Sequence, residues 1–175
     1  ERFGGQLPPI YLATLRNKML QLATDISEGA IWANASLSHM SQQLSEIPNA
    51  VRDDFFLANM IPTVIDDDIE AARAVNRRTL TGYVSLPNYR NYWRAAGYVE
   101  EMDAIEAAIE AGNKDILPSL MSDKWLEDNT ISGSASHVRA RFEEWAHAGV
   151  TPIAVMSSTT GGQVKAINQL FDIYN

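Results

Sequence analysis

The stretch from Pro8 to Trp32, PPIYLATLRNKMLQLATDISEGAIW, decides the fold of this 175-residue chain. Ile10 to Ala13 is short and apolar, and polar turn residues follow it, which is typical of a buried parallel strand. Apolar residues then recur at helical spacing, so we expect a helix over Asn17 to Ser27 that ends at Gly29. Ala30 to Asn34 follows as a second apolar strand. The opening of the chain therefore predicts a βαβ unit.

The next segments continue this alternation. A helix that Ser36 or Ser38 caps precedes an apolar strand from Phe55 to Ile65, in which Pro62 indicates an irregular or edge-like end. We interpret the acidic triplet 66–68 as the cap of the next helix rather than as a metal site, because carboxylates suit the positive end of a helix.

The second half of the chain is mostly helical. The pattern over 83–130 is helical and interrupted, and the serine-rich segment 132–136 caps a helix over His137 to Ala148. A last strand over 150–156 and a last helix over 163–174 follow. The sequence thus predicts an α/β fold with four strands in parallel βα units and a helical insertion, 83–130, before the last strand.

Composition excludes several classes of function. A net charge of −8 leaves no excess of Lys and Arg to neutralise phosphates, which argues against nucleic acid or an anionic membrane as a partner. The absence of Cys excludes disulfides and thiolate metal sites. The three histidines, His39, His137 and His147, all fall in predicted helices without zinc-ligand spacing, so we expect no metal site. Because we find neither an apolar run of about 20 residues nor a signal peptide, we expect a soluble, cytoplasmic chain.

Several motifs follow one another in a characteristic order. Those in the first third of the chain are Pro9-Ile10-Tyr11-Leu12-Ala13-Thr14, Lys18-Met19-Leu20-Gln21-Leu22-Ala23 and Ser27-Glu28-Gly29. Further along the chain come Arg77-Arg78 with Tyr83 and Pro87-x-Tyr89, and the stretch from Ile131 to Val150. In this order and spacing the motifs resemble, across nearly the whole chain, the luciferase-like monooxygenases, which use a flavin or a deazaflavin. The later motifs resemble the deazaflavin-type branch of that family.

This resemblance implies that residues 1–175 are a single partial domain, the C-terminal half of a (β/α)8 TIM barrel. The implied parent is an oxidoreductase that uses FMN or the deazaflavin coenzyme F420 for hydride transfer to, or monooxygenation of, a small organic substrate. It also implies a homo-oligomeric parent protein. The family carries its acid/base histidine in the first four strands. We therefore expect the chain to be inactive without an N-terminal half, and its catalytic residues are unknown.

The carboxyl ends of the strands carry the active site in such barrels, which directs attention to the turn Thr14-Leu15-Arg16-Asn17. Free N–H groups and the helix dipole favour a phosphate at this strand-to-helix junction, and Arg16 can add a charge-assisted pair. The family places flavin phosphate contacts in or near this turn, although many deazaflavin-type members carry Gly-Pro where this chain has Arg16-Asn17. The alternative is a plain capped helix start.

Three further positions are candidates. Asn34 and Ser36 follow the second strand and could reach a cofactor phosphate or ring, or simply cap the next helix. The loop Ser157 to Gly162 is either a small anion-binding loop or an ordinary turn. Tyr89 is a candidate substrate-binding residue because the insertion roofs the barrel in the resembling family. Alternatively, Tyr89 and its aromatic neighbours form core.

A second function hypothesis comes from a different class. A barrel needs about eight strands to close, and four parallel strands leave two raw edges. The chain could therefore be a non-catalytic half-barrel that binds a ligand or a partner subunit through those edges. For the same reason we expect the isolated chain to be oligomeric or prone to aggregate.

Overall fold

The computed structural model describes residues 7–48 and 53–175. Strands and helices alternate through the first part of the chain, as the sequence predicts. These elements are β1 (Tyr11–Ala13), α1 (Asn17–Ile26), β2 (Gly29–Ala33), α2 (Leu37–Ser45) and β3 (Phe56–Ile65).

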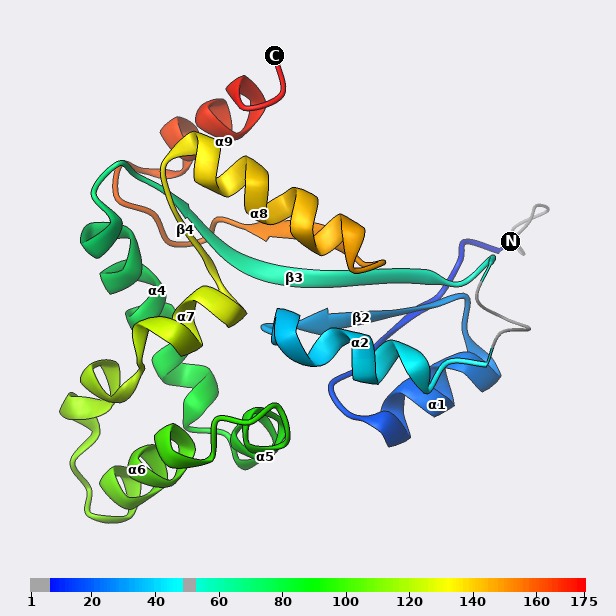
Figure 1. The fold of residues 1–175 in the computed structure, drawn as a ribbon, viewed down its shortest axis with the longest axis horizontal. Helices are drawn as coiled ribbons and strands as arrows, with labels where there is room; N and C mark the ends of the chain where they lie inside the picture. The colour runs from blue at the N-terminus through cyan, green and yellow to red at the C-terminus, as the bar shows by residue number, and fades with distance from the viewer. Residues whose placement is uncertain (1–6, 49–52) are drawn as a thin grey trace, which may run out of the picture.

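The second part begins with a run of helices and returns to the sheet twice. Figure 1 shows α5 and α6 at one end of the molecule, away from β2 and β3. The elements are α4 (Ile69–Val84), α5 (Pro87–Ala95), α6 (Val99–Glu110), the 3-10 helix η1 (Lys114–Leu120), α7 (Asp123–Asn129), β4 (Ile131–Gly133), α8 (Ala135–His147), β5 (Thr151–Val155) and α9 (Gln163–Asp172).

All the strand pairings in the described residues are parallel, which confirms the predicted α/β class. β3 is the central strand: it pairs with β2 and β4 along one edge and with β5 along the other, and β1 pairs with β2. Helices α4 to α7 and η1 intervene between β3 and β4. Ion pairs hold this helical run together, with Arg90 Nη2 2.9 Å from Glu106 Oε1 between α5 and α6.

The prediction of four strands is wrong, because the described residues contain five. The missed strand, β4, has only three residues and lies directly before the helix cap that the sequence did reveal. Ser134 is that cap, and its side chain accepts a hydrogen bond from the N–H of His137. The helical run consequently precedes β4 rather than the last strand.

The edge-like interpretation of Pro62 is wrong because β3 has partners on both sides, whereas the irregular interpretation agrees with a break in the pairing at this residue. The N–H groups of Phe56 and Asp66 donate to Glu28 and Gly133, so the even-numbered residues of β3 turn their N–H groups toward β2 and β4. Pro62 belongs to this set and has no N–H to donate. Its position falls in the gap between the last residue paired with β2 and the first paired with β4. A central strand can therefore carry this proline without losing a ladder hydrogen bond.

Gly29 opens β2 instead of terminating the preceding helix, which ends at Ile26. The reason for a glycine is a close approach of neighbouring strands. A Cβ at Gly29 would lie 2.4 Å from the carbonyl oxygen of Phe56 and 2.7 Å from the ring of Tyr11. Only glycine fits between these strands without a shift of backbone.

The two faces of the sheet differ in how they are covered. On one face, Trp32 of β2 and Ile61 of β3 belong to the main core with residues of α1, α2 and α8, and both are fully buried. On the other face, Met60 is 42% exposed although it lies in the central strand. Met60 is thus an exposed position on this face, whereas Ala58 and Val64, which alternate with it along β3, are fully buried.

Candidate functional site

The β1–α1 turn has a buried hydroxyl without a partner. The N–H of Thr14 donates to the carbonyl of Ile31 over 2.9 Å, which extends the β1–β2 ladder by one residue. The Thr14 residue is only 5% exposed, and its Oγ1 has no hydrogen-bond partner among the described residues. A buried hydroxyl usually has a partner, so this atom is a candidate to bond a group that lies outside the described residues.

Arg16 and Asn17 lie at the start of α1, as predicted. Arg16 is the N-cap residue in extended conformation, and its carbonyl accepts the first intrahelical hydrogen bonds, from Met19 and Leu20. Both side chains at this helix start are exposed. Arg16 has no ion pair with the described residues, so its guanidinium is free to approach an anion.

Asn34 has a second unpartnered polar group at the end of the neighbouring strand. Its N–H donates to the carbonyl of Met60 over 3.0 Å. Its φ of 58° makes it the one non-glycine residue with positive φ in the described part of the chain. Its Nδ2 is buried without a hydrogen-bond partner there. Strained backbone and an unpaired buried amide at one residue are features that cluster at binding sites.

Ser36 differs from Thr14 and Asn34 because its hydroxyl and its N–H already have hydrogen-bond partners. It is the N-cap residue of α2, but its side chain makes no cap hydrogen bond, and Ser38 bonds to Asp128 instead. Neither serine therefore caps α2 with its hydroxyl, contrary to expectation. The Ser36 Oγ donates to Asn129 Oδ1 over 2.6 Å, and its N–H donates to the Tyr92 hydroxyl over 2.9 Å.

A buried hydrogen-bond network joins the two turns to the helical run. We call Gln43, Tyr92, Trp93 and Asn129 the buried network. Gln43 Nε2 donates to the carbonyl of Leu15 over 3.0 Å, and its Oε1 accepts from the Tyr92 hydroxyl over 3.2 Å. Trp93 Nε1 is 2.8 Å from Asn129 Oδ1 and 3.2 Å from the carbonyl of Asn34. The carbonyls of Leu15 and Asn34 are thus held through one set of side chains.

Sequence reasoning missed Gln43 and Asn129. The sequence held a usable signal for Gln43, because Gln43 lies three residues after Met40 and both side chains lie on the buried face of α2. A polar residue on an apolar helix face usually has a buried partner. No comparable local signal marks Asn129, whose partners come from distant parts of the chain.

Tyr89 lies half-buried on α5, one turn before Trp93. Its ring contacts that of Tyr83 edge-on, with centroids 5.1 Å apart, and that of Trp93 with centroids 5.4 Å apart. Burial raises the pKa of the Tyr89 hydroxyl, and Tyr83 adds to the rise. Tyr89 is therefore linked to the Asn34 turn only indirectly, through Trp93.

A carboxylate, that of Asp66, lies against the loop Ser157–Gly162, which follows β5. Asp66, at the end of β3, accepts a hydrogen bond from Thr160 in this loop and another, over 2.9 Å, from the N–H of Asp68. These bonds, with Lys165 nearby, lower the pKa of Asp66. An anion in the Ser157–Gly162 loop would meet this negative charge. The β1–α1 turn is the better anion site.

The histidines lie in helices, as predicted. His39 is in α2, while His137 and His147 are in α8, where His137 Nε2 is 3.1 Å from Glu127 Oε1. The described residues contain no group of three or more His, Cys, Asp or Glu side chains placed to share a metal ion. None of their helices has the length and apolar character that a membrane crossing requires.

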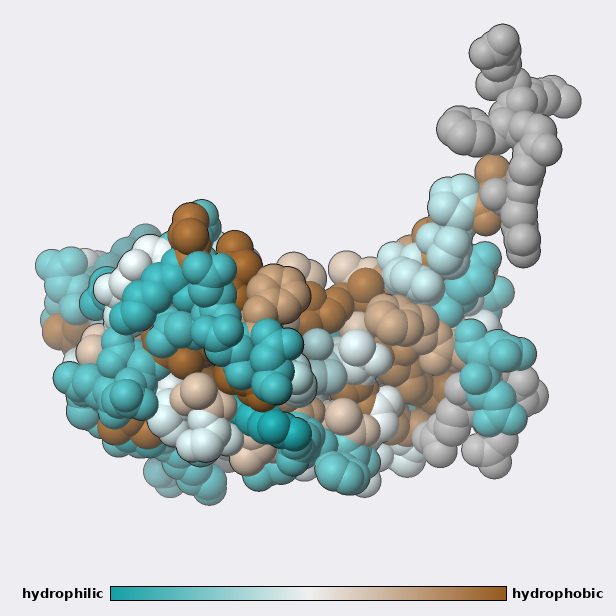
Figure 2. Space-filling model, turned by 90° about the horizontal axis from the view of Figure 1, so that it is seen from above, coloured by the Kyte–Doolittle hydropathy of each residue, from teal (hydrophilic) through white to brown (hydrophobic). Residues whose placement is uncertain are grey.

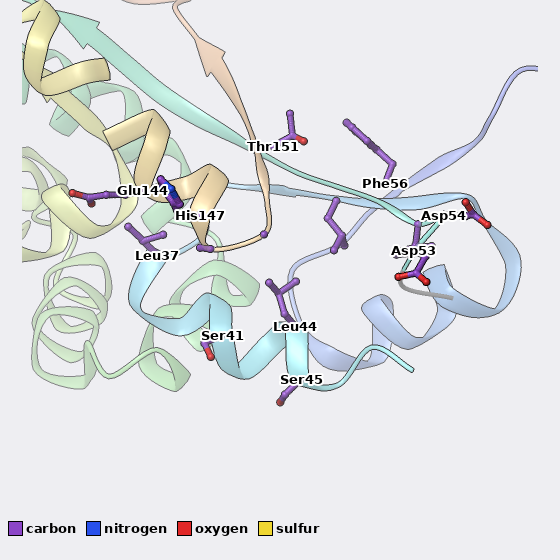
Figure 3. Close-up of a pocket in the computed structure, with 14 residues that line it drawn as sticks. Leu37, Ser41, Leu44, Ser45, Asp53, Asp54, Phe56, Glu144, His147 and Thr151 are labelled. Atoms are coloured by element: carbon purple, nitrogen blue, oxygen red, sulfur yellow. The ribbon is translucent and has the colours of Figure 1, made fainter. Parts of the chain in front are cut away.

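A cavity of about 1410 Å³ opens at the opposite end of the sheet, where β3 and β5 begin. Figure 3 shows Glu144 and His147 on one side of it, and Asp53 and Asp54 on the other. Neither Thr14 nor Asn34 lines this cavity.

The chain is thus an α/β protein of parallel βα units, with unpaired polar groups at the carboxyl ends of two strands in its described part. The family model of the luciferase-like monooxygenases matches residues 2–152. The chain belongs to this family, and the predicted resemblance is confirmed. It has the fold of a luciferase-like oxidoreductase. No curated protein matches it.

Two solved structures have a similar fold. One is a coenzyme F420-dependent tetrahydromethanopterin reductase from Methanopyrus kandleri, with a TM-score of 0.75 and 22% identity over 93% of this chain and 48% of that chain. The other is an F420-dependent secondary alcohol dehydrogenase in complex with an F420-acetone adduct, with a TM-score of 0.62 and 13% identity over 95% of this chain and 47% of that one. The present chain spans about half the length of either structure.

Proposed function

We propose that residues 1–175 are the C-terminal half of a luciferase-like oxidoreductase barrel that binds the phosphate of a flavin-type cofactor at the β1–α1 turn. The helical run over 83–130 forms an insertion that roofs the carboxyl ends of the strands, with Tyr89 on the substrate side. The parent enzyme transfers a hydride to, or oxygenates, a small organic substrate. By their names, both solved neighbours depend on coenzyme F420, which favours F420 over FMN here.

The observation that carries this proposal is the unpartnered hydroxyl of Thr14. Thr14 Oγ1 and Asn34 Nδ2 are donors, so they suit a group that brings acceptor oxygens. The exposed Arg16 guanidinium and the start of α1 add positive charge at the same turn. A phosphate offers acceptor oxygens and negative charge, which suit donors and a cation of this kind, so the chemistry of the residues present fits the cofactor. Thr14, Leu15, Arg16, Asn17 and Asn34 would hold it.

These contacts give each residue of the site a distinct role. A bound flavin or deazaflavin supplies the redox chemistry. Thr14 and Arg16 bind and orient its phosphate, while the engaged hydroxyl of Ser36 serves the cofactor through the position of the Asn34 turn. The insertion excludes water from the strand ends and contributes Tyr89. The acid/base residue comes from another part of the barrel.

The test is a titration of the chain with coenzyme F420, with FMN and with a phosphate-free riboflavin analogue, followed by cofactor fluorescence. Arg16→Ala should weaken binding of the phosphorylated cofactor by roughly 1.5–3 kcal/mol, which is about ten- to a hundredfold in Kd. Binding of the phosphate-free analogue should change less. Lys18→Ala, an exposed cation on the same helix, is the matched control and should leave the affinity almost unchanged.

Thr14→Val separates binding from folding. Valine keeps the shape and removes an unpaired buried hydroxyl, so the stability of the cofactor-free chain should stay the same or rise. The affinity for the phosphorylated cofactor should fall. If Arg16→Ala and the original chain bind it equally, Arg16 has no role. If neither cofactor binds the original chain, the non-catalytic half-barrel is the better hypothesis.

A further inference from the structure

The hydroxyl of Tyr92 lies between the two turns of the candidate site. It accepts a hydrogen bond from the N–H of Ser36 over 2.9 Å and donates one to Gln43 Oε1 over 3.2 Å. Gln43 Nε2 in turn donates to the carbonyl of Leu15 over 3.0 Å. A continuous row of hydrogen bonds therefore runs from the Asn34–Ser36 turn to the β1–α1 turn. We call Tyr92 and Gln43 the turn bridge.

The turn bridge is buried, and its groups fit together in one way. Tyr92 and Gln43 are each 1% exposed. Burial raises the pKa of the Tyr92 hydroxyl, so this group stays protonated and can donate to Gln43. A reversed Gln43 amide would set two acceptors, its Oε1 and the carbonyl of Leu15, against each other. The donors and acceptors of the bridge thus favour a single arrangement.

The helical run reaches the two turns through its interior. It occupies one end of the molecule in Figure 1, and Figure 2 shows mainly hydrophilic residues on the surface of that end. Inside, two neighbouring side chains of α5 bond to the Asn34–Ser36 turn: Tyr92, and Trp93, whose Nε1 lies 3.2 Å from the carbonyl of Asn34. The β1–α1 turn is linked to α5 through the turn bridge.

Loss of the Tyr92 hydroxyl would therefore affect the two turns unequally. The second link to α5 would still hold the carbonyl of Asn34. Gln43 Oε1 would lose its donor, so the side chain of Gln43 would restrain the carbonyl of Leu15 less firmly. Leu15 is in the middle of the β1–α1 turn. The position of this turn relative to Asn34 would then be less well defined.

We propose that Tyr92 is a positioning residue of the cofactor site, which sets the separation between the donors of the β1–α1 turn and the amide of Asn34. This role rests on the proposed function, in which Thr14, Arg16 and Asn34 hold one cofactor. Donors on two separate turns bind the same phosphate well only when their spacing is fixed before the ligand arrives. Tyr92 acts through Gln43 and does not itself contact the phosphate.

The turn bridge also links the cofactor to the insertion. If the position of α5 affects the affinity for the cofactor, the bound cofactor must stabilise that position of α5 by the same free energy. Backbone amides of α5 should therefore exchange their hydrogens more slowly in the presence of the cofactor. This protection should depend on the hydroxyl of Tyr92.

Two substitutions remove the turn bridge from opposite ends. Tyr92→Phe keeps the ring and removes the hydroxyl, and it should raise the Kd of the phosphorylated cofactor about five- to tenfold. Gln43→Met keeps the length of the side chain and should have a similar effect, and it provides the test should Tyr92→Phe fail to fold. The double variant should bind about as well as either single variant, because both changes break one row of hydrogen bonds.

Tyr98→Phe is the matched control. The Tyr98 hydroxyl donates to Asp128 Oδ2 over 2.8 Å, so this substitution also removes a tyrosine hydroxyl with a partner but leaves the bonds to both turns intact. It should leave the Kd of the phosphorylated cofactor unchanged. The phosphate-free riboflavin analogue should bind all four chains about equally. Cofactor-dependent protection of α5 should persist in Tyr98→Phe and be largely lost in Tyr92→Phe.

The contrary results separate this proposal from the proposed function. If Tyr92→Phe and Gln43→Met bind the phosphorylated cofactor as the original protein does, Tyr92 is not a positioning residue, although the cofactor site stands. An equal loss in Tyr98→Phe, or for the phosphate-free analogue, would show a general effect on the fold and overturn the proposal. Protection of α5 that persists in Tyr92→Phe would do the same. If the original protein binds neither cofactor, the proposed function fails and the positioning role fails with it.

Discussion

Replacing Asn129 by alanine tests whether the buried network stabilises the fold as much as its contacts indicate. Asn129 is fully buried. Its Oδ1 accepts from Ser36 Oγ and Trp93 Nε1, and its Nδ2 donates to the carbonyl of Trp125 over 2.6 Å. After Asn129→Ala, Trp93 Nε1 still reaches the carbonyl of Asn34. The hydroxyl of Ser36 keeps no acceptor among the described residues.

The magnitude follows from these contacts. A buried donor left without a partner costs roughly 1–3 kcal/mol, and each lost hydrogen bond that water does not replace contributes about 1 kcal/mol. Asn129→Ala should therefore lower the free energy of unfolding by about 3 kcal/mol. Ser36→Ala removes the donor and leaves Asn129 bonded to Trp93, so it should cost only about 1 kcal/mol. Ser36→Ala introduced into Asn129→Ala should cost almost nothing further.

Urea unfolding at a fixed chain concentration measures these values, because association would otherwise contribute to the apparent stability. The four chains of the double-mutant cycle are compared at one concentration and salt. A loss below about 1 kcal/mol for Asn129→Ala, or strictly additive effects of the two substitutions, would refute the reasoning. In that case the network would not constrain the Asn34–Ser36 turn.

Three further predictions concern single residues. Gly29→Ala should cost roughly 1–3 kcal/mol in urea unfolding, because its Cβ would meet the backbone oxygen of Phe56; an unchanged midpoint would contradict the close approach. Burial lowers the pKa of His39, against a smaller opposite effect of Asp128, so the stability that neutral His39 provides is complete above about pH 6.5 and declines as the pH falls below that value. His39→Gln should flatten this decline in the free energy of unfolding, and an unaltered slope would exclude His39 as the source of the decline. Asp68→Ala should cost about 1 kcal/mol because Asp68 accepts from two N–H groups at the start of α4, whereas Asp67→Ala should cost little; equal losses would rule out a specific cap.

The strands and helix starts that the sequence predicted are those whose signals are local. Asp68 caps α4 and Ser134 caps α8, as their positions ahead of apolar helical patterns indicated. The buried residues of α8, Val138, Phe142 and Trp145, form one face of the helix at the spacing that a core-facing helix requires. β4 escaped because three residues are too few to show an alternating pattern. The edge interpretation of Pro62 failed because strand neighbours are set by the whole sheet.

The residues of the candidate site also differ in whether the sequence alone could reveal them. Thr14 and Arg16 could be placed from the rule that chemistry lies at the carboxyl ends of parallel strands, a rule that needs only the order of elements. Asn129 could not, since it meets Ser36 across 93 positions of sequence. Nor could the sequence reveal that the Ser36 hydroxyl has a hydrogen-bond partner while that of Thr14 has none within residues 7–48 and 53–175. Hydrogen-bond partners at this distance are fixed only when the helices pack.

The distribution of engaged and free polar groups around the strand ends favours a site over a purely structural junction. A junction that served stability alone would satisfy its buried donors, because each unpaired one costs free energy. The chain satisfies Gln43, Tyr92 and Asn129 and so fixes the carbonyls of Leu15 and Asn34. Among the described residues, nevertheless, Thr14 Oγ1 and Asn34 Nδ2 have no hydrogen-bond partner at the two turns that this network holds. Turns that are held in place by buried hydrogen bonds, and that carry donors without partners, are the arrangement expected where a ligand completes the hydrogen bonding.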